Sequence, residues 1–240
     1  MDNYIKVKSK LIENKIITDV KISEIYDYLI DGEIIVLKNV FNQSTVLKLK
    51  ELAFDWAIKQ DISDANDFYK LTNTNHYCVH KGVSKIQKTL HCYASLNFNN
   101  LGIKSDLFNS LIFHVKILTD FYRELINNDS SFVLDSSKIH PQIIHYPQGG
   151  GFFSKHIHSL RPQLFGLILG LSKFGNDYSS GGTGFEKPNG EIVDLEKDLD
   201  AGDIALFRYD LPHWVGSVDI EQSLNFNNTK GRWTLIIPHY

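Results

Sequence analysis

Residues 145–159 read HYPQGGGFFSKHIHS, and this stretch is the strongest pointer to the fold in the chain. The Tyr-Pro pair and the glycine triplet indicate a turn, and the aromatic run that follows is typical of a strand. His156 and His158 stand two positions apart, so on a strand both side chains point to the same face. The pair is therefore a candidate for two ligands of one metal ion.

A third ligand is expected from far along the chain. His213 is the best candidate, in AGDIALFRYDLPHWVGSV (201–218), where a Gly-Asp turn begins one strand and a second turn begins the next. Imidazole binds iron, zinc, copper and nickel, so the residue types alone leave the metal open. Histidine is also used elsewhere in the chain, and a packed pair without metal stays an alternative; the other examples are His140, His145 and His239.

The sequence around these histidines predicts a single α+β, mainly β domain over residues 1–240. Short apolar runs separated by Gly, Pro, Asn and Asp fill residues 131–240, which predicts a double-stranded β-helix, or jelly roll, carrying the metal site. Residues 1–130 are predicted to be mainly helical with the first strands, and their helices to pack against the jelly roll.

The N-terminal elements follow from periodicity and capping. Helices are predicted over 4–17, with Lys6, Lys8 and Lys10 on a solvated face, over 45–59 after a cap at Asn42 or Ser44, and over 106–127. Strands are predicted within 31–41 and over 89–98. The polar residues 60–88 are predicted to form a long loop or lid.

Composition narrows the partners and the compartment. The 240 residues carry a net charge of -3, so no basic surface argues for nucleic acid. The longest apolar run, LFGLILGL (164–171), is too short to span a bilayer. Two cysteines, Cys78 and Cys92, do not make a disulfide scaffold. A cytoplasmic protein that acts on a small molecule, away from membranes and nucleic acids, is the expectation.

Several short motifs in order resemble the Fe(II)/2-oxoglutarate-dependent dioxygenases, in particular their prolyl-hydroxylase-like branch. The similarity covers about residues 143–240, from the Tyr146-Pro147 corner to His158, then GGTGFE (181–186), AGDIALF (201–207), PHW (212–214) and GRWTLIIP (231–238). The resemblance implies Fe(II), 2-oxoglutarate and O2 as cofactor and co-substrates. It also implies oxidation, by default hydroxylation, of a substrate C–H bond with release of succinate and CO2.

The resemblance also assigns residues. His156 would be the first iron ligand and His213 the last, while His158 stands where the family has Asp or Glu. Either His158 ligates, giving a three-histidine site, or it lies off the metal and leaves a position open. Arg232 matches the arginine that pairs with the far carboxylate of 2-oxoglutarate. The remaining co-substrate contacts implied are a hydroxyl from Thr234 and a hydrogen bond from Tyr146.

Two other interpretations stay open. GGFFSKHIH also resembles the opening motif of the cupins, in which Gln163 would add to the three histidines, and the enzyme would be a dioxygenase or isomerase without 2-oxoglutarate. That interpretation gives no role to Arg232 or Tyr146. The third is a jelly-roll binding protein without enzymatic activity. Arg161, close to the ligand positions, could meet a substrate carboxylate or phosphate.

Overall fold

The computed structural model describes residues 3–59, 63–64, 76–79, 91–97, 105–127, 129, 132, 134–135, 138–195 and 197–239. Within them the chain is mostly β with three helices, α1 (Ile22–Ile30), α2 (Gln43–Ala57) and α3 (Asp106–Ile126). At that level the predicted fold class is confirmed. Most of the predicted lid, residues 60–88, lies outside the described residues.

The strands form one mixed sheet that bends back on itself. Its order is β11-β10-β13-β8-β6-β7-β14-β9-β12-β3-β1-β2, with β4 and β5 attached beside β6. Their bounds are β1 (Ile5–Ile12), β2 (Lys15–Thr18), β3 (Ile35–Lys38), β4 (Ser63–Asp64), β5 (His76–Val79), β6 (His91–Asn97), β7 (Gln142–Pro147), β8 (Gly151–His156), β9 (Phe165–Gly170), β10 (Thr183–Glu186), β11 (Ile192–Asp194), β12 (Ile204–Arg208), β13 (His213–Val218) and β14 (Gly231–Ile236).

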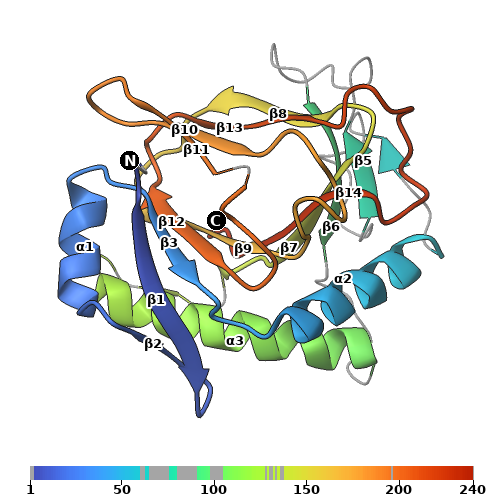
Figure 1. Cartoon of the computed structure of the whole chain (residues 1–240). Coiled ribbons are helices and arrows are strands. Elements are labelled where there is room, and N and C mark those ends of the chain that lie inside the picture. Colours follow the sequence, from blue (N-terminus) through green and yellow to red (C-terminus); the bar gives the residue numbers. More distant parts are fainter. Residues whose placement is uncertain are drawn as a thin grey trace.

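Strand β6 is where the sheet turns. It pairs with β7 through residues 94–97 and with β8 through residues 91–92, so it joins two groups of strands. In Figure 1, β8, β13 and β10 lie opposite β7, β9 and β12, as two walls of a barrel. All pairs in both walls are antiparallel, and the side chains that alternate inward meet between them.

The three helices lie along the outside of the wall that contains β7, β9 and β12. Figure 1 shows α2 and α3 side by side below the barrel. One core cluster contains Leu29 of α1, Leu49 of α2 and Leu118 of α3 together with Leu37 of β3 and Leu169 of β9. Burial of such side chains drives the helices onto the sheet. Among the helices in the described ranges, none has both the length and the apolar character to cross a membrane.

Local sequence signals explain two of the helices. The Asn42 side chain accepts a hydrogen bond from the Ser44 backbone N–H at 2.9 Å, so Asn42 is the N-cap of α2. Ser105 caps α3 in the same way by accepting from the Phe108 backbone N–H at 3.1 Å. The predicted helices over 45–59 and 106–127, and the predicted strands within 31–41 and 89–98, are confirmed.

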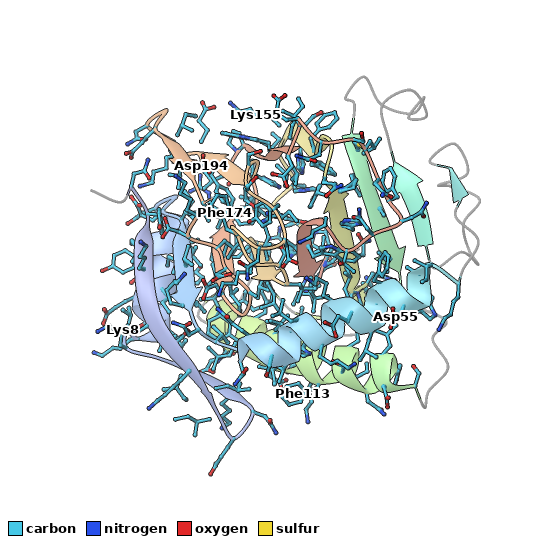
Figure 2. All side chains as sticks on the ribbon, turned by 45° about the vertical axis from the view of Figure 1, so that its right-hand side comes forward. Lys8, Asp55, Phe113, Lys155, Phe174 and Asp194 are labelled. Carbon is cyan, nitrogen blue, oxygen red and sulfur yellow. The ribbon has the colours of Figure 1, made fainter. Side chains whose placement is uncertain are left out.

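The predicted helix over residues 4–17 is wrong. These residues form the β1–β2 hairpin, which turns at Glu13 and Asn14 with φ of 48° and 63°. Val7 is buried while Lys8 is exposed, and Figure 2 shows Lys8 pointing away from the sheet. The alternating lysines therefore have the period of a strand, not of a helix. Parallel pairing of β1 with β3 then supplies the hydrogen-bond partners that fix this choice.

The glycine triplet makes the tight turn that sends the chain from β7 into β8. Gly149 and Gly150 have φ of 86° and 105°, a region that other residues rarely adopt. Their backbone N–H groups donate to Asp219 and Val218 at the end of β13, at 3.1 and 2.8 Å. The turn thus sets β8 beside β13, the two strands that carry His156 and His213.

Candidate metal centre

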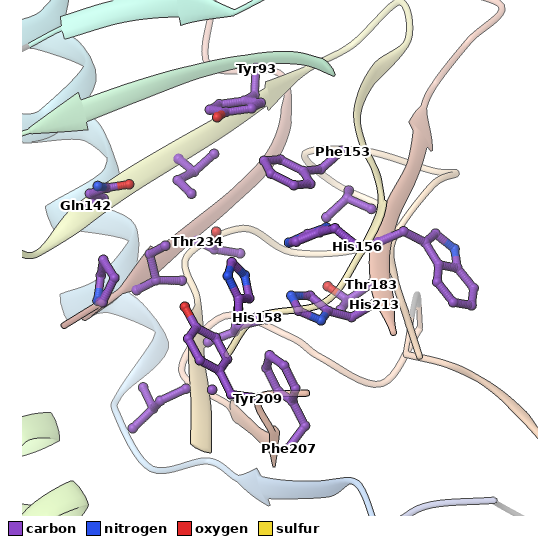
Figure 3. A pocket seen from close by; sticks show the side chains of 18 of the residues that line it. Tyr93, Gln142, Phe153, His156, His158, Thr183, Phe207, Tyr209, His213 and Thr234 are labelled. Carbon is purple, nitrogen blue, oxygen red and sulfur yellow. The ribbon is translucent and has the colours of Figure 1, made fainter. Parts of the chain in front are cut away.

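The structure brings the three histidines together at one end of β8 and β13. His156 is the last residue of β8, His158 follows two positions later, and His213 is the first residue of β13 and pairs with His156. One ring nitrogen from each lies within 4.8 Å of the other two. Figure 3 shows the three rings facing a common space. Three converging imidazoles are a donor set that a transition metal such as iron or zinc can use.

Backbone carbonyls orient two of the rings. The Nδ1–H of His156 donates to the Ser154 carbonyl oxygen and that of His213 to the Leu211 carbonyl oxygen, each at 2.8 Å. Such a bond fixes the tautomer and leaves Nε2 unprotonated. The Nε2 atoms of His156 and His213 are therefore the ones prepared to bind a metal ion.

The protonation state of the cluster also suits a metal. Burial lowers the pKa of His156. Burial and the positive charge that the neighbouring rings would carry lower the pKa of His158 to about 4 and that of His213 to about 3. All three rings are neutral at pH 7, the form in which imidazole ligates. The residues present thus fit a divalent metal without a prior loss of protons.

His158 is held differently from the other two. Among the described residues no hydrogen bond to its ring is found. Instead its ring stacks on Tyr209, with centroids 4.2 Å apart and planes 18° from parallel, and its backbone N–H donates to the Tyr209 carbonyl oxygen at 3.1 Å. Stacking on Tyr209 takes the place of the carbonyl bond that aims His156 and His213.

Removing this stacking should loosen the metal site. Tyr209→Leu is expected to weaken Co(II) binding by roughly 10- to 100-fold, the usual cost of losing a group that orients a ligand. Tyr209→Phe keeps the ring and should bind Co(II) as the wild type does. Isothermal titration of the metal-free proteins measures both. Equal losses in the two variants would show that the hydroxyl, rather than the stacked ring, supports His158.

Arg232 lies across the same cavity, on the opposite wall. It is 3% exposed, and its Nη2 donates to the Thr183 hydroxyl. Its guanidinium carbon lies 5.6 Å from the centroid of the Tyr146 ring, because Arg232 and Tyr146 are paired on β14 and β7. Within the described ranges no acid pairs with Arg232. A buried cation of this kind is prepared for an anionic ligand.

Two hydroxyls lie on the same cavity wall. Thr234 is buried two positions after Arg232 and lines the cavity beside it. Burial raises the pKa of Tyr146 to about 12 although the nearby Arg232 charge lowers it, so the hydroxyl stays protonated and can donate. The sequence-predicted group of Tyr146, Arg232 and Thr234 is therefore assembled in one place.

The histidines and this group share one cavity of about 180 Å³. Its lining is largely apolar and aromatic, and contains no Asp or Glu among the described residues. Figure 3 shows Phe153, Phe207 and Tyr209 around the rings, with Tyr93 at the top and Gln142 at the left of the view. Of the adjacent Phe152 and Phe153, only Phe153 lines the cavity, as alternation along a strand requires.

Some residues near the site have other roles, and others were not anticipated. The amide of Gln163 is used at both ends, since it donates to the Phe165 carbonyl oxygen at 2.9 Å and accepts from the His239 backbone N–H at 3.2 Å. Arg161 is exposed, with its guanidinium 5.3 Å from the Phe132 ring, and does not line the cavity. The cavity residues that sequence reasoning missed include three polar ones, Gln142, Thr183 and Tyr209.

Comparison with known proteins identifies the fold. No family model and no curated protein sequence matches the chain. Among solved structures, a Pseudomonas putida prolyl-4-hydroxylase matches with a TM-score of 0.58 at 14% identity, over 91% of this chain and 99% of that one. A Trichoplax adhaerens prolyl hydroxylase, in complex with a peptide fragment of hypoxia inducible factor, matches with 0.60 at 12% identity, over 90% and 88%.

A third similar structure is an oxidoreductase of the 2OG-Fe(II) oxygenase family from Burkholderia pseudomallei, with a TM-score of 0.57 at 11% identity over 91% of this chain and 90% of that one. At these identities the similarity is one of fold. The chain thus has the fold of the prolyl hydroxylases and 2OG-Fe(II) oxygenases, with a cluster of three histidines in its cavity. The resemblance noted from the motifs is confirmed at that level.

Proposed function

We propose that this protein is a non-haem Fe(II)- and 2-oxoglutarate-dependent oxygenase. The observation that carries the proposal is Arg232, a buried guanidinium with no acidic partner among the described residues, in the same cavity as three neutral histidines. A buried charge without a counter-charge is costly, so an anion is expected beside it. A dicarboxylate co-substrate supplies that anion, and a carboxylate fits the fork of the guanidinium.

Each contact that the resemblance implies has a residue in this chain. His156, His158 and His213 would hold the iron. Arg232 would bind the far carboxylate of 2-oxoglutarate, and the hydroxyls of Thr234 and Tyr146 would donate hydrogen bonds to the same ligand. This arrangement fixes the co-substrate at one end of the cavity.

The remaining cavity residues would orient the substrate and shield the reacting groups from water. When bound, Fe(II) with 2-oxoglutarate and O2 would supply the oxidation of a substrate C–H bond, with release of succinate and CO2. Ile144, Phe153 and Phe207 line the cavity and exclude water from the reacting groups. Hydroxylation is the proposed outcome.

The proposed substrate is a small molecule, because a cavity of about 180 Å³ that also takes the co-substrate has room only for a compact group. The Trichoplax adhaerens protein is in complex with a peptide, so a peptide side chain entering the same cavity is the second candidate. A cytoplasmic location belongs to the same proposal and rests on the use of only two cysteines.

The cupin interpretation has weaker support. It needs Gln163 as an additional ligand, yet both ends of that amide are bonded to the backbone. It also leaves Arg232 and Tyr146 without a role, although both are buried and line the same cavity as the histidines.

The proposal predicts a specific optical signal. Fe(II) and then 2-oxoglutarate, added without oxygen to the metal-free protein, should produce the weak visible absorption of a keto acid bound to iron. Succinate has the two carboxylates but no keto group, and should produce none. Tight metal binding without the band would contradict the proposal and favour cupin-type chemistry. Absence of metal binding would favour a binding protein.

A further inference from the structure

The cavity has no negative charge of its own in the described part of the chain. Its lining includes Arg232 and the three histidines but neither Asp nor Glu. The family to which the motifs are similar has a carboxylate at the position of His158. Replacing it by an imidazole removes one negative charge from the site, and nothing else in the described lining restores it.

Acidic residues close to the histidines in the fold are already paired. Glu186 follows Phe185, the β10 partner of the third histidine, and forms an ion pair with Lys155. Figure 2 shows Lys155 on the outside of the barrel. Asp210 accepts from Arg208 Nε at 2.6 Å. Each pair is neutral as a whole and lies outside the cavity lining, so neither balances charge inside it.

Charge inside the loaded cavity would then not balance. Histidine ligands are neutral. A divalent metal and the Arg232 guanidinium bring three positive charges, and 2-oxoglutarate brings two negative ones. One positive charge remains in a largely apolar, buried space, where it is poorly solvated. With a carboxylate at position 158 the same groups would sum to zero.

We propose that the cavity binds a second anionic ligand, and that in the working protein this ligand is a carboxylate of the substrate, bound beside His158. The inference rests on the proposed function, since it counts the charges of iron and 2-oxoglutarate. It deepens that function by naming the substrate class: a molecule that presents a monoanionic carboxylate next to the bond to be oxidised.

The cavity has space and a donor for such a group. Tyr146 and Gln142 line it from the same face of β7, four residues or roughly 13 Å apart. The Gln142 carbonyl oxygen accepts from the Ser95 hydroxyl at 3.4 Å, so its NH₂ is the end left to donate. The co-substrate would bind at Arg232, and the substrate carboxylate on the side of His158 and Gln142, since all three residues line the one cavity.

Acetate and acetamide test the inference, because they match in size and differ in charge. The Co(II) protein is saturated with 2-oxoglutarate, and binding of each probe is followed by the visible spectrum of the metal. The wild type is expected to bind acetate at least about tenfold more tightly than acetamide. His158→Asp should abolish that preference. Gln142→Glu puts a carboxylate into the cavity at a position that is not one of the histidines, and should also abolish the preference.

Tighter binding of acetate than of acetamide by the wild type, lost in the variants, would support the inference. Equal binding of acetate and acetamide by the wild type, or an unchanged preference in both variants, would overturn the inference. If His158→Asp fails to fold or to bind Co(II), the wild-type preference and Gln142→Glu still give the answer. Chloride binding as tight as acetate would overturn the assignment to a substrate carboxylate. Failure of 2-oxoglutarate to bind would instead overturn the proposed function, which separates the two.

Discussion

Replacing Arg232 by methionine is expected to weaken 2-oxoglutarate binding by about 30-fold or more, because truncating one partner of a buried charge pair costs roughly 2–5 kcal/mol. The variant should still bind the metal, since Arg232 lies on β14, across the cavity from the three histidines at the end of β8 and the start of β13. Titration of 2-oxoglutarate into the Co(II) protein measures the effect. Arg232→Lys should fall between the two, because it keeps the charge and loses the bidentate geometry.

The same substitution should not harm the metal-free protein. With no acid beside it in the described residues, the buried guanidinium costs solvation energy in the absence of ligand. The thermal midpoint of Arg232→Met is therefore expected to equal or exceed that of the wild type. Arg123→Met is the matched control, since Arg123 is exposed on α3 and pairs with Asp120 at 2.7 Å. Unchanged 2-oxoglutarate binding in Arg232→Met would remove the main support for the proposed function.

Much of the site could be predicted because strands impose a period of two. Arg232 and Thr234 both lie on β14 and face one side together, as their spacing predicted. His158 lies two residues beyond the end of β8, so its place beside His156 depends on the chain after the strand as well. The local sequence pattern does not predict which strands pair or which walls of the barrel face each other. Pairing of β13 with β8 places His213 beside His156. This pairing joins strands that are far apart in the sequence, and only the order of the motifs indicated it.

The cavity residues that the sequence did not predict have no neighbour at a spacing of two that marks them as part of a site. Tyr209 lies in the turn between β12 and β13, and its stacking on His158 depends on how that turn meets the end of β8. Thr183 and Gln142 come from other strands and are ordinary polar residues in sequence. The N-terminal hairpin was missed for the opposite reason. Lys6, Lys8 and Lys10 were assigned to a solvated helix face although their spacing of two is that of a strand, and pairing with β3 then completes the hairpin.

Substitution of the histidines decides whether His158 is a metal ligand. His213→Ala removes a ring whose Nδ1 is already bonded to the Leu211 carbonyl oxygen. It is expected to weaken Co(II) binding by more than the roughly 10- to 100-fold that losing an orienting group costs. If all three rings ligate, His158→Ala should cause a loss of similar size. His140→Ala is the control, because His140 does not line the cavity.

Co(II) binding by His158→Ala, compared with His213→Ala, also bears on the charge of the loaded cavity. Wild-type affinity in His158→Ala would mean that two histidines hold the metal and that the site keeps an extra open position. A small ligand could then enter that position, and the charge argument for a substrate carboxylate would hold without any contact to His158. Loss of metal in both variants would instead make His158 the third ligand. Tyr209, which stacks on His158 at 4.2 Å, would then be the residue that lets an imidazole stand where a carboxylate is usual.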